Sequence, residues 1–319
     1  MKNNNSELKY SVLLMSIPLM VVFGLYAHSR INNSSEIIVA NDLNTNTPRE
    51  NFNTIEAIKN PYSNISIRAK SAIVKDLNTG EIIYSKSPDS PMPLASINKV
   101  MTALVATIES NSDQDVFISQ MALMTEGEDF LRLGERFSLK DLLEFMLVKS
   151  SNDGAAAIAQ AFEFNSPGVS FVGKMNEIAN KIGMNNTYFL NETGLDENLV
   201  TAGSFGTSRD VATMMEFALK NYPEILYSTK EIDIKTRSKN GIQHQATNTN
   251  GIISELGNMV ASKTGFTDLA GGNLAVIVDP ALNKPVAIVV LGSTFEGRFD
   301  DVLKLSNSLE EYFNYKTKK

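Results

Sequence analysis

The sequence predicts an α+β layered fold in which strands near both ends of the folded region form a sheet, and a helical lobe interrupts it. Two β-branched runs with hairpin signals occur within residues 69–85 and again within 273–291. Most of the residues between them follow helical periodicity. The composition, 43% hydrophobic and 20% charged, is ordinary for a globular protein. About 260 residues from Tyr62 onward are enough to bury one large core.

The first elements are a hairpin and a helix. Two apolar runs flank Asn78-Thr79-Gly80, a turn sequence that favours a tight connection between antiparallel strands. From Ser96 the pattern becomes helical, because Val100, Leu104 and Ile108 recur every four residues.

Three further helices and a second hairpin follow. Residues 139–160 and 169–182 have helical periodicity, and Gly183 suits the position just past a helix end. Residues 208–219 predict another helix, with Ser208 as its N-cap and an acidic first turn. The β-branched runs 273–278 and 286–291 predict a hairpin, and 300–312 predict a closing amphipathic helix.

The N-terminal region is expected to be a membrane or export segment. Residues 11–27 carry no charge and follow Lys2 and Lys9, so residues 1–27 are interpreted as a cytoplasmic tail with a signal anchor or signal peptide. A helix over the uncharged run spans roughly 25 Å. The bulky Leu25 before Ala27 disfavours cleavage, so a single-pass anchor in the cell membrane is expected, with secretion as the alternative.

Two segments follow this anchor. Residues 28–62 are polar and lack apolar periodicity, which predicts a flexible tether. Residues 63–319 are expected to form one domain outside the cytoplasm, with the helical lobe at roughly 105–250.

Composition excludes several classes of site. The chain has 36 acidic and 29 basic residues, a net charge of -7 that disfavours general nucleic-acid binding. It has no cysteine, which excludes a thiolate metal site and a cysteine nucleophile. Its only histidines are His28 and His244, so a multi-histidine metal site is impossible. We therefore expect no metal and no cofactor, and a catalytic base other than histidine.

Ser96-Ile97-Asn98-Lys99 is the first motif that could take part in catalysis. Residues three apart share one helix face, so the Ser96 hydroxyl and the Lys99 amine can meet. An amine can act as a base only when neutral, which requires the lysine pKa to fall by about 3 units from ~10.4. The spacing alone is a weak signal, because Ser6 and Lys9 share it.

Ser150-Ser151-Asn152 is the second motif. A hydroxyl and a carboxamide two residues apart in a turn could point into one cleft, relay a proton and bind a substrate amide. The alternative is a cluster that caps the helix beginning near Gly154.

Lys263-Thr264-Gly265-Phe266-Thr267 is the third motif, after a predicted strand at 259–261. Lys263 and Thr264 could bind a carboxylate, and Gly265 would let a substrate backbone approach closely. Strand N–H groups could pair with an extended peptide. The ordered set of three motifs is typical of penicillin-binding proteins and class A β-lactamases and indicates a serine acyl-enzyme.

The chain resembles the low-molecular-mass penicillin-binding D-alanyl-D-alanine carboxypeptidases of the serine peptidase type. The likeness runs from about residue 65 to the C-terminus. Besides the three motifs it includes 93–103, 147–153, 171–176, 182–189, Asn191, 194–195 and 207–210. The resemblance implies a β-lactamase/transpeptidase-like three-layer fold, with an antiparallel sheet flanked by helices and an inserted helical lobe.

The resemblance also implies roles for individual residues. Ser96 would be the nucleophile, Lys99 its base, and Ser150 and Asn152 would assist proton transfer and position the substrate. Lys263 would keep Lys99 neutral and, with Thr264 and Arg298, hold the substrate's terminal carboxylate. The N–H groups of Ser96 and Phe266 would form the oxyanion hole, beside Gly265 and Thr267. The implied substrate is a peptidoglycan stem peptide ending in D-alanine, and β-lactam antibiotics would acylate the same serine.

Three alternatives stay open. A class A-like β-lactamase needs a glutamate three residues before Leu190-Asn191, where this chain has Thr187. A D,D-endopeptidase uses the same acyl-enzyme and differs in what the cleft admits beyond the scissile bond. A wall-binding protein with a decayed site is disfavoured because every motif residue is present. Many relatives carry a C-terminal β-rich domain, and we expect none here, because the sequence after the helix expected at 300–312 is a short basic tail.

Overall fold

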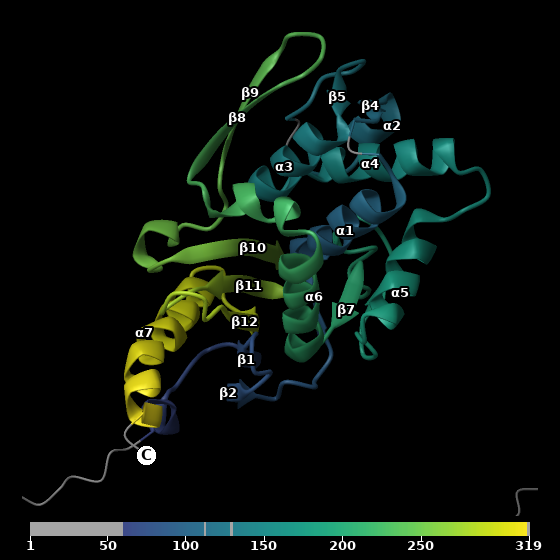
Figure 1. Cartoon of the computed structure of the whole chain (residues 1–319). Coiled ribbons are helices and arrows are strands. Elements are labelled where there is room, and N and C mark those ends of the chain that lie inside the picture. The colour runs from purple at the N-terminus through teal and green to yellow at the C-terminus, as the bar shows by residue number, and fades with distance from the viewer. Residues whose placement is uncertain (1–59, 112, 128–129, 318–319) are drawn as a thin grey trace, which may run out of the picture. The chain divides into compact units, whose positions relative to one another are not determined.

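A five-stranded antiparallel sheet lies at the centre of the fold (Figure 1). The computed structural model describes residues 60–111, 113–127 and 130–317. The strand order in the sheet is β10-β11-β12-β1-β2, so strands from the two ends of the chain pair in its middle. The strands are β1 (Ser71–Asp76), β2 (Ile82–Lys86), β10 (Met259–Thr267), β11 (Gly271–Val278) and β12 (Val286–Ser293).

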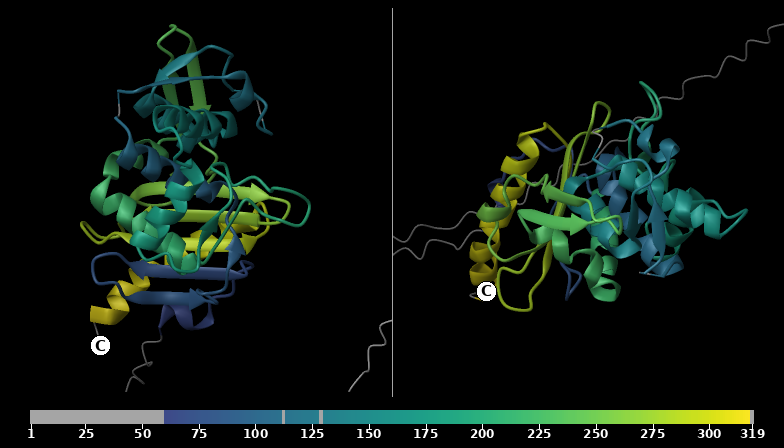
Figure 2. Two further views of the ribbon diagram at one scale, coloured as in Figure 1. Left: turned by 90° about the vertical axis from the view of Figure 1, so that its right-hand side faces the viewer. Right: turned by 90° about the horizontal axis from the view of Figure 1, so that it is seen from above.

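Both faces of this sheet are buried, which explains why its strands read as continuous β-branched runs. Along β11, Leu274, Val276 and Val278 pack into one hydrophobic core, whereas Ala275 and Ile277 pack into another. Alternate side chains of a strand point to opposite faces. The sheet is therefore the middle of three layers, as Figure 2 shows from above.

Helix α7 (Gly297–Thr317) covers one face of the sheet together with the short helix η1 (Pro61–Asn64). The Tyr62 hydroxyl donates to the Leu305 carbonyl at 2.7 Å. The fully buried Asp301 accepts from the backbone N–H of Arg68 at 2.8 Å and of Ala69 at 2.7 Å, and from the Ser293 hydroxyl at 2.7 Å. This carboxylate joins α7 to the sheet and to the segment that enters β1.

The other face is covered by α6 (Ser208–Asn221) and by the helix pair η2 (Ala95–Asn98) and α1 (Lys99–Glu109). The remaining elements lie in the chain between β3 and β10 (Figure 1). They are β3 (Met92–Pro93), β4 (Asp115–Phe117), α2 (Gln120–Leu123), β5 (Arg136–Ser138), α3 (Leu139–Lys149), α4 (Asn152–Asn165), α5 (Phe171–Lys181), β6 (Tyr188–Phe189), β7 (Ser204–Gly206), η3 (Pro223–Ile225), η4 (Tyr227–Lys230), β8 (Asp233–Arg237), β9 (Gln243–Thr247) and η5 (Ile253–Glu255).

The structure confirms the α+β layered fold and both hairpins, and corrects two local expectations. The helix expected over 139–160 is two helices, because Ser150 adopts a left-handed conformation with φ of 63° and ends α3. The N-cap of α6 is Thr207 rather than Ser208, since the Thr207 hydroxyl accepts from the Asp210 N–H at 3.0 Å. Gly183 follows α5 with φ of 89°, as expected of a residue just past a helix end.

The expected anchor (1–27) lies outside the described residues, as does nearly all of the expected tether (28–62). Among the residues that the structure describes, no helix has the length and apolar character needed to cross a bilayer.

Replacing Asp301 should destabilise the protein strongly. Asp301→Ala leaves the buried N–H of Ala69, the partly buried N–H of Arg68 and the buried Ser293 hydroxyl without their acceptor. We expect a loss of about 3 kcal/mol or more in the free energy of unfolding. The matched control is Asp300→Ala, which removes an exposed carboxylate paired with Arg68 at 2.5 Å and should cost less than about 1 kcal/mol. Urea unfolding of both variants measures the difference, and equal midpoints would contradict the anchoring role of Asp301.

Candidate active site

Ser96, where the sequence predicts the start of a helical pattern, lies in the 3-10 turn η2 directly before α1. This turn has a strained backbone and is held by hydrogen bonds from the sheet. Ala95 adopts a left-handed conformation with φ of 51°. This conformation is unfavourable for alanine and persists only where the surrounding structure holds it. The buried Asn273 amide donates to the carbonyls of Pro93 at 2.9 Å and Leu94 at 3.0 Å. These bonds join the turn that carries Ser96 to strand β11.

Lys99 is fully buried, and its amine contacts only oxygen atoms among its described partners. Its Nζ donates to Ser96 Oγ at 2.9 Å, to Asn152 Oδ1 at 2.6 Å and to the Thr193 carbonyl at 2.7 Å. Burial lowers the pKa of Lys99 to about 7, although the carboxylates of Glu192 and Asp153 act in the opposite direction. A substantial fraction of this amine is therefore neutral near pH 7, within hydrogen-bond distance of a hydroxyl.

The break between α3 and α4 presents the second motif to the same cleft. Ser151 caps α4 through a bond from the Gly154 N–H at 2.9 Å, so the capping role falls to the middle serine. Asn152 accepts from Lys99, and its amide nitrogen donates to the Glu126 carbonyl at 2.8 Å. Ser150 accepts a bond from Lys263 at 2.8 Å.

Lys263 provides a second buried amine, on strand β10. Besides Ser150, its Nζ donates to the Thr264 carbonyl at 2.9 Å. Burial holds the pKa of Lys263 well below its usual value, and the positive charges of Lys99 and Arg298 add to this effect. Two amines in one dry cleft repel each other when both are charged, which favours states in which at least one is neutral.

A cavity of about 360 Å³ opens beside these groups. Its lining includes Ser96, Ser150, Thr264, Phe266 and Arg298. Arg298 Nη1 donates to the Gly265 carbonyl at 2.9 Å. Burial lowers the pKa of Arg298 to about 10, so the guanidinium remains cationic at neutral pH. The cavity thus combines a nucleophilic hydroxyl with a fixed positive charge, which suits a substrate that ends in a carboxylate.

The expected oxyanion donor Phe266 lies on an exposed edge of the sheet. β10 pairs with β11 on one side only. On its other side, the Ser262 N–H donates to the Thr229 hydroxyl at 3.2 Å. Because N–H groups alternate between the two edges of a strand, those of Thr264 and Phe266 face the same side as that of Ser262.

Gly265 and Thr267 have different surroundings from those expected. A Cβ on Gly265 would lie 2.7 Å from the Leu94 carbonyl oxygen and 3.2 Å from the Ile97 nitrogen. Gly265 therefore allows close packing of β10 against η2. It also lines the cavity beside Ser96, and the expected approach of a substrate backbone stays a prediction. Thr267 donates to Asp196 at 2.9 Å and lines a neighbouring cavity of about 550 Å³, which shares Phe266 with the first.

Sequence reasoning missed several supporting groups. The Thr193 carbonyl is a backbone acceptor, so its residue type gives no signal. Asn191 holds that loop by accepting from the N–H groups of Thr193 at 3.2 Å and Gly194 at 2.7 Å. Asn273 and Thr249 lie far from Ser96 in the sequence, and the tertiary fold brings them to the site. Neither belongs to a motif.

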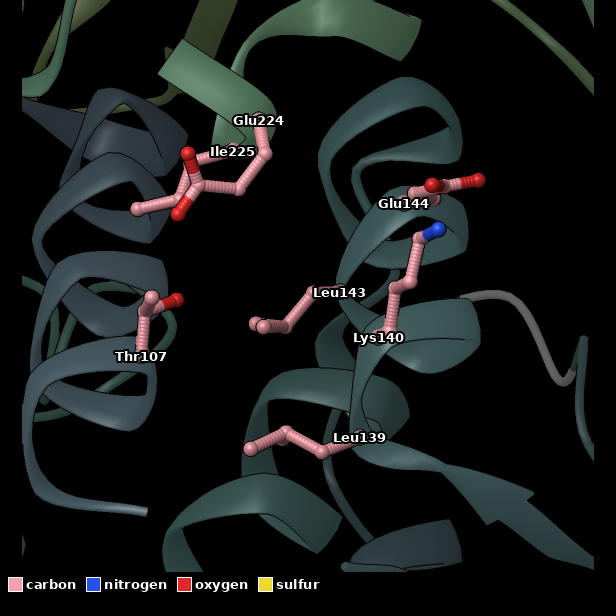
Figure 3. A pocket seen from close by; sticks show the side chains of 7 residues that line it. All are labelled: Thr107, Leu139, Lys140, Leu143, Glu144, Glu224 and Ile225. Carbon is pink, nitrogen blue, oxygen red and sulfur yellow. The ribbon is translucent and has the colours of Figure 1, made fainter. Parts of the chain in front are cut away.

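Another cavity, of about 300 Å³, lies between α1, α3 and η3 (Figure 3). Thr107, Leu143 and Ile225 are among its lining residues, and burial raises the pKa of Glu144 at the same cavity. None of the motif residues lines it.

Within residues 60–111, 113–127 and 130–317, no group of three or more His, Asp or Glu side chains could hold a metal ion. The expectation of a site without metal or cofactor stays a prediction.

The arrangement is suited to acyl transfer. A neutral amine next to Ser96 can accept its proton, and the second amine next to Ser150 can supply a proton on the other side of the cleft. Thr187, which stands where a class A β-lactamase has its glutamate, donates instead to Asp210 on α6 at 2.8 Å.

Comparisons with known proteins identify relatives of this chain. A family model described as D-alanyl-D-alanine carboxypeptidase matches residues 56–294. The D-alanyl-D-alanine endopeptidase of Escherichia coli K12 is 38% identical over 233 residues, which cover 70% of this chain and 71% of that protein. The endopeptidase of Pseudomonas aeruginosa is 35% identical, with 75% and 76% covered. The carboxypeptidase DacF of Bacillus subtilis is 29% identical, with 76% and 62% covered.

Solved structures are similar as well. Penicillin-binding protein D2 from Listeria monocytogenes, in its ampicillin-bound form, has a TM-score of 0.66 and 27% identity, covering 78% of this chain and 99% of that one. A D-alanyl-D-alanine carboxypeptidase from Mycobacterium tuberculosis has a TM-score of 0.68 at 23% identity, covering 80% and 93%, and supports the fold.

A methyl group on Gly265 should displace Ser96. Gly265→Ala places a Cβ against the Leu94 carbonyl, so η2 must shift away from Lys99, and we expect acylation of Ser96 by penicillin to slow by about tenfold or more. Gly257→Ala is the matched control, because nothing lies within 4 Å of its added Cβ. Stopped-flow acylation by a fluorescent penicillin measures both, and an unchanged rate for Gly265→Ala would contradict the close packing.

Proposed function

The chain belongs to the D-alanyl-D-alanine carboxypeptidase family of serine hydrolases, and we propose that Ser96 cleaves the bond after the penultimate D-alanine of peptidoglycan stem peptides. One observation carries this proposal: the fully buried Lys99 amine, with a pKa of about 7, lies 2.9 Å from the Ser96 hydroxyl. A base of this pKa is suited to work at neutral pH.

In the proposed acylation, neutral Lys99 takes the Ser96 proton while Oγ attacks the D-alanyl carbonyl carbon. The N–H groups of Ser96 and Phe266 stabilise the oxyanion that forms. When the C–N bond breaks, the leaving amine receives the proton that Lys99 took from Ser96, relayed through the Ser150 hydroxyl, which is bonded to Lys263 at 2.8 Å. Lys99 is then neutral again and can act as the base for deacylation. Water then attacks the ester, gives its proton to the Ser96 oxygen through the same base, and releases the peptide carboxylate.

The cleft also favours a substrate with a free C-terminal carboxylate. The Thr264 hydroxyl and the cationic Arg298 line the cavity beside Ser96. The open edge of β10 would pair with the extended backbone of the stem peptide. Asn152, held by Lys99 and the Glu126 carbonyl, would bind the substrate amide, and the neighbouring cavity at Thr267 extends the groove past Phe266. β-Lactams would acylate Ser96 in the same pose.

A D,D-endopeptidase is the second candidate. The Escherichia coli and Pseudomonas aeruginosa relatives at 38% and 35% identity are both named endopeptidases. The two activities share the acyl-enzyme, and an endopeptidase cleft must also admit a leaving group that belongs to a second stem peptide. The cavity of about 360 Å³ beside Ser96 opens to solvent on the side of Phe295, which is 48% exposed.

We also propose that residues 1–27 export the domain and anchor it to the cell membrane, as a single-pass segment or a cleaved signal. The support is the uncharged run 11–27 after two lysines, together with a substrate that lies outside the cytoplasm. The expected tether, 28–62, would end before η1, because Tyr62 packs on the sheet with α7 and so belongs with the enzyme domain expected at 63–319.

Product analysis with defined substrates tests the function. We expect mass spectrometry to show loss of one terminal D-alanine from a pentapeptide, and cleavage of a cross-linked dimer if the endopeptidase reading holds. Ser96→Ala should release no product and take no penicillin label, whereas Ser90→Ala, at an exposed serine, should behave as wild type. Product release by Ser96→Ala would rule out this nucleophile, and rapid release of hydrolysed penicillin would favour the β-lactamase alternative.

The acylation rate should follow the protonation of Lys99. Because the neutral amine is the active form and its pKa is about 7, the rate should rise about tenfold per pH unit below about 7 and level off above it. Lys99→Arg should be nearly inactive at every pH, because a guanidinium stays protonated. Unfolding midpoints across the same pH range serve as the control, and a flat rate profile between pH 5 and 8 would mean that another group takes the proton.

A further inference from the structure

Thr249 is a residue of the cleft that no motif contains. It lies between β9 and β10, and its hydroxyl is 2.5 Å from the hydroxyl of Thr264. Both residues line the cavity that also contains Ser96 and Arg298. Thr264 is almost fully buried, and Thr249 is half-buried at the cavity wall. Within the described part of the chain, the bond between these two hydroxyls is the only one found for either of them.

Counting protons shows what the pair offers a ligand. Each hydroxyl has one proton, and the bond between the two uses one of them. The other proton remains for a group in the cavity, so the pair always presents an O–H donor to it. A carboxylate is an acceptor only, which makes it the ligand class that this pair suits.

We propose that Thr249 is a positioning residue for the substrate's terminal carboxylate. Its hydroxyl donates to Thr264, fixes the rotamer of that side chain and leaves the Thr264 proton for the carboxylate. This inference rests on the proposed function, because it assigns the carboxylate to the same cavity. It adds a determinant of specificity that acts on substrate recognition and not on the proton transfer at Ser96.

Arg298 makes a different contribution to the cavity. Its Nη1 is already committed to the Gly265 carbonyl at 2.9 Å, and its Nε is buried without a partner in the structure. The guanidinium therefore supplies positive charge at the cavity wall, and the hydroxyl pair supplies an oriented donor. Loss of the Thr249 hydroxyl should weaken discrimination between a carboxylate and a neutral group of the same shape.

The test uses benzylpenicillin and its methyl ester, which carry the same reactive ring and differ in the carboxylate. Acylation rate constants are measured with the full chain for wild type, Thr249→Val, Thr249→Ala and Thr249→Ser. We expect the wild type to prefer the acid. Both variants without a hydroxyl should react roughly five- to tenfold more slowly with the acid, and almost normally with the ester, as for loss of one hydrogen bond between neutral groups. Thr249→Ser should restore the preference.

A double-mutant cycle separates positioning from a general structural effect. If Thr249 acts through Thr264, the Thr249→Val change should have little further effect on acid preference once Thr264→Val is present. Full additivity, an unchanged preference in both hydroxyl-free variants, or an equal loss with acid and ester would overturn the inference. No acylation of the wild type by the acid would instead refute the proposed function, and the inference with it.

Discussion

The burial of the Lys99 amine is the constraint on which the rest of the site depends. Taking an ammonium out of water is costly, so a fully buried lysine must either be compensated or lose its proton. Here three oxygen acceptors satisfy the amine, and its pKa of about 7 leaves both protonation states accessible. Each acceptor comes from a different part of the chain: the turn η2, the start of α4 and the loop at Thr193. These three segments must therefore come together correctly before the amine has its acceptors.

The sheet fixes the nucleophile through contacts that have no chemical role of their own. Asn273 on β11 binds the carbonyls that precede Ser96, and Gly265 on β10 lets the same turn pack closely. Both strands are buried on two faces, so they can hold this turn rigidly. A rigid support matters because displacement of a reacting group by about an ångström can cost two orders of magnitude in rate.

The sequence was sufficient to predict contacts between residues that are close in the chain. It was not sufficient for contacts and backbone conformations that depend on the tertiary fold. Ser96 and Lys99 are three residues apart, and their contact follows from helical geometry whether the turn is α or 3-10. The contact between Lys263 and Ser150 joins residues far apart in the chain, and neither the spacing nor the family resemblance predicted it. The left-handed Ser150 was missed because its neighbours 139–160 read as one helix. Thr249 and the Thr193 carbonyl were missed because a lone threonine and a backbone oxygen have no sequence pattern.

The open edge of β10 has a consequence for the behaviour of the protein in concentrated solution. An unpaired strand edge can recruit a strand from another molecule and begin aggregation. In this chain the Thr229 hydroxyl accepts from the outward N–H of Ser262, and the Ser262 hydroxyl donates to the Thr229 carbonyl at 3.1 Å. The exposed ladder therefore begins only at Thr264, near the end of the strand at Thr267. So short a free edge offers little backbone for pairing with a strand of another molecule, which should limit aggregation through β10.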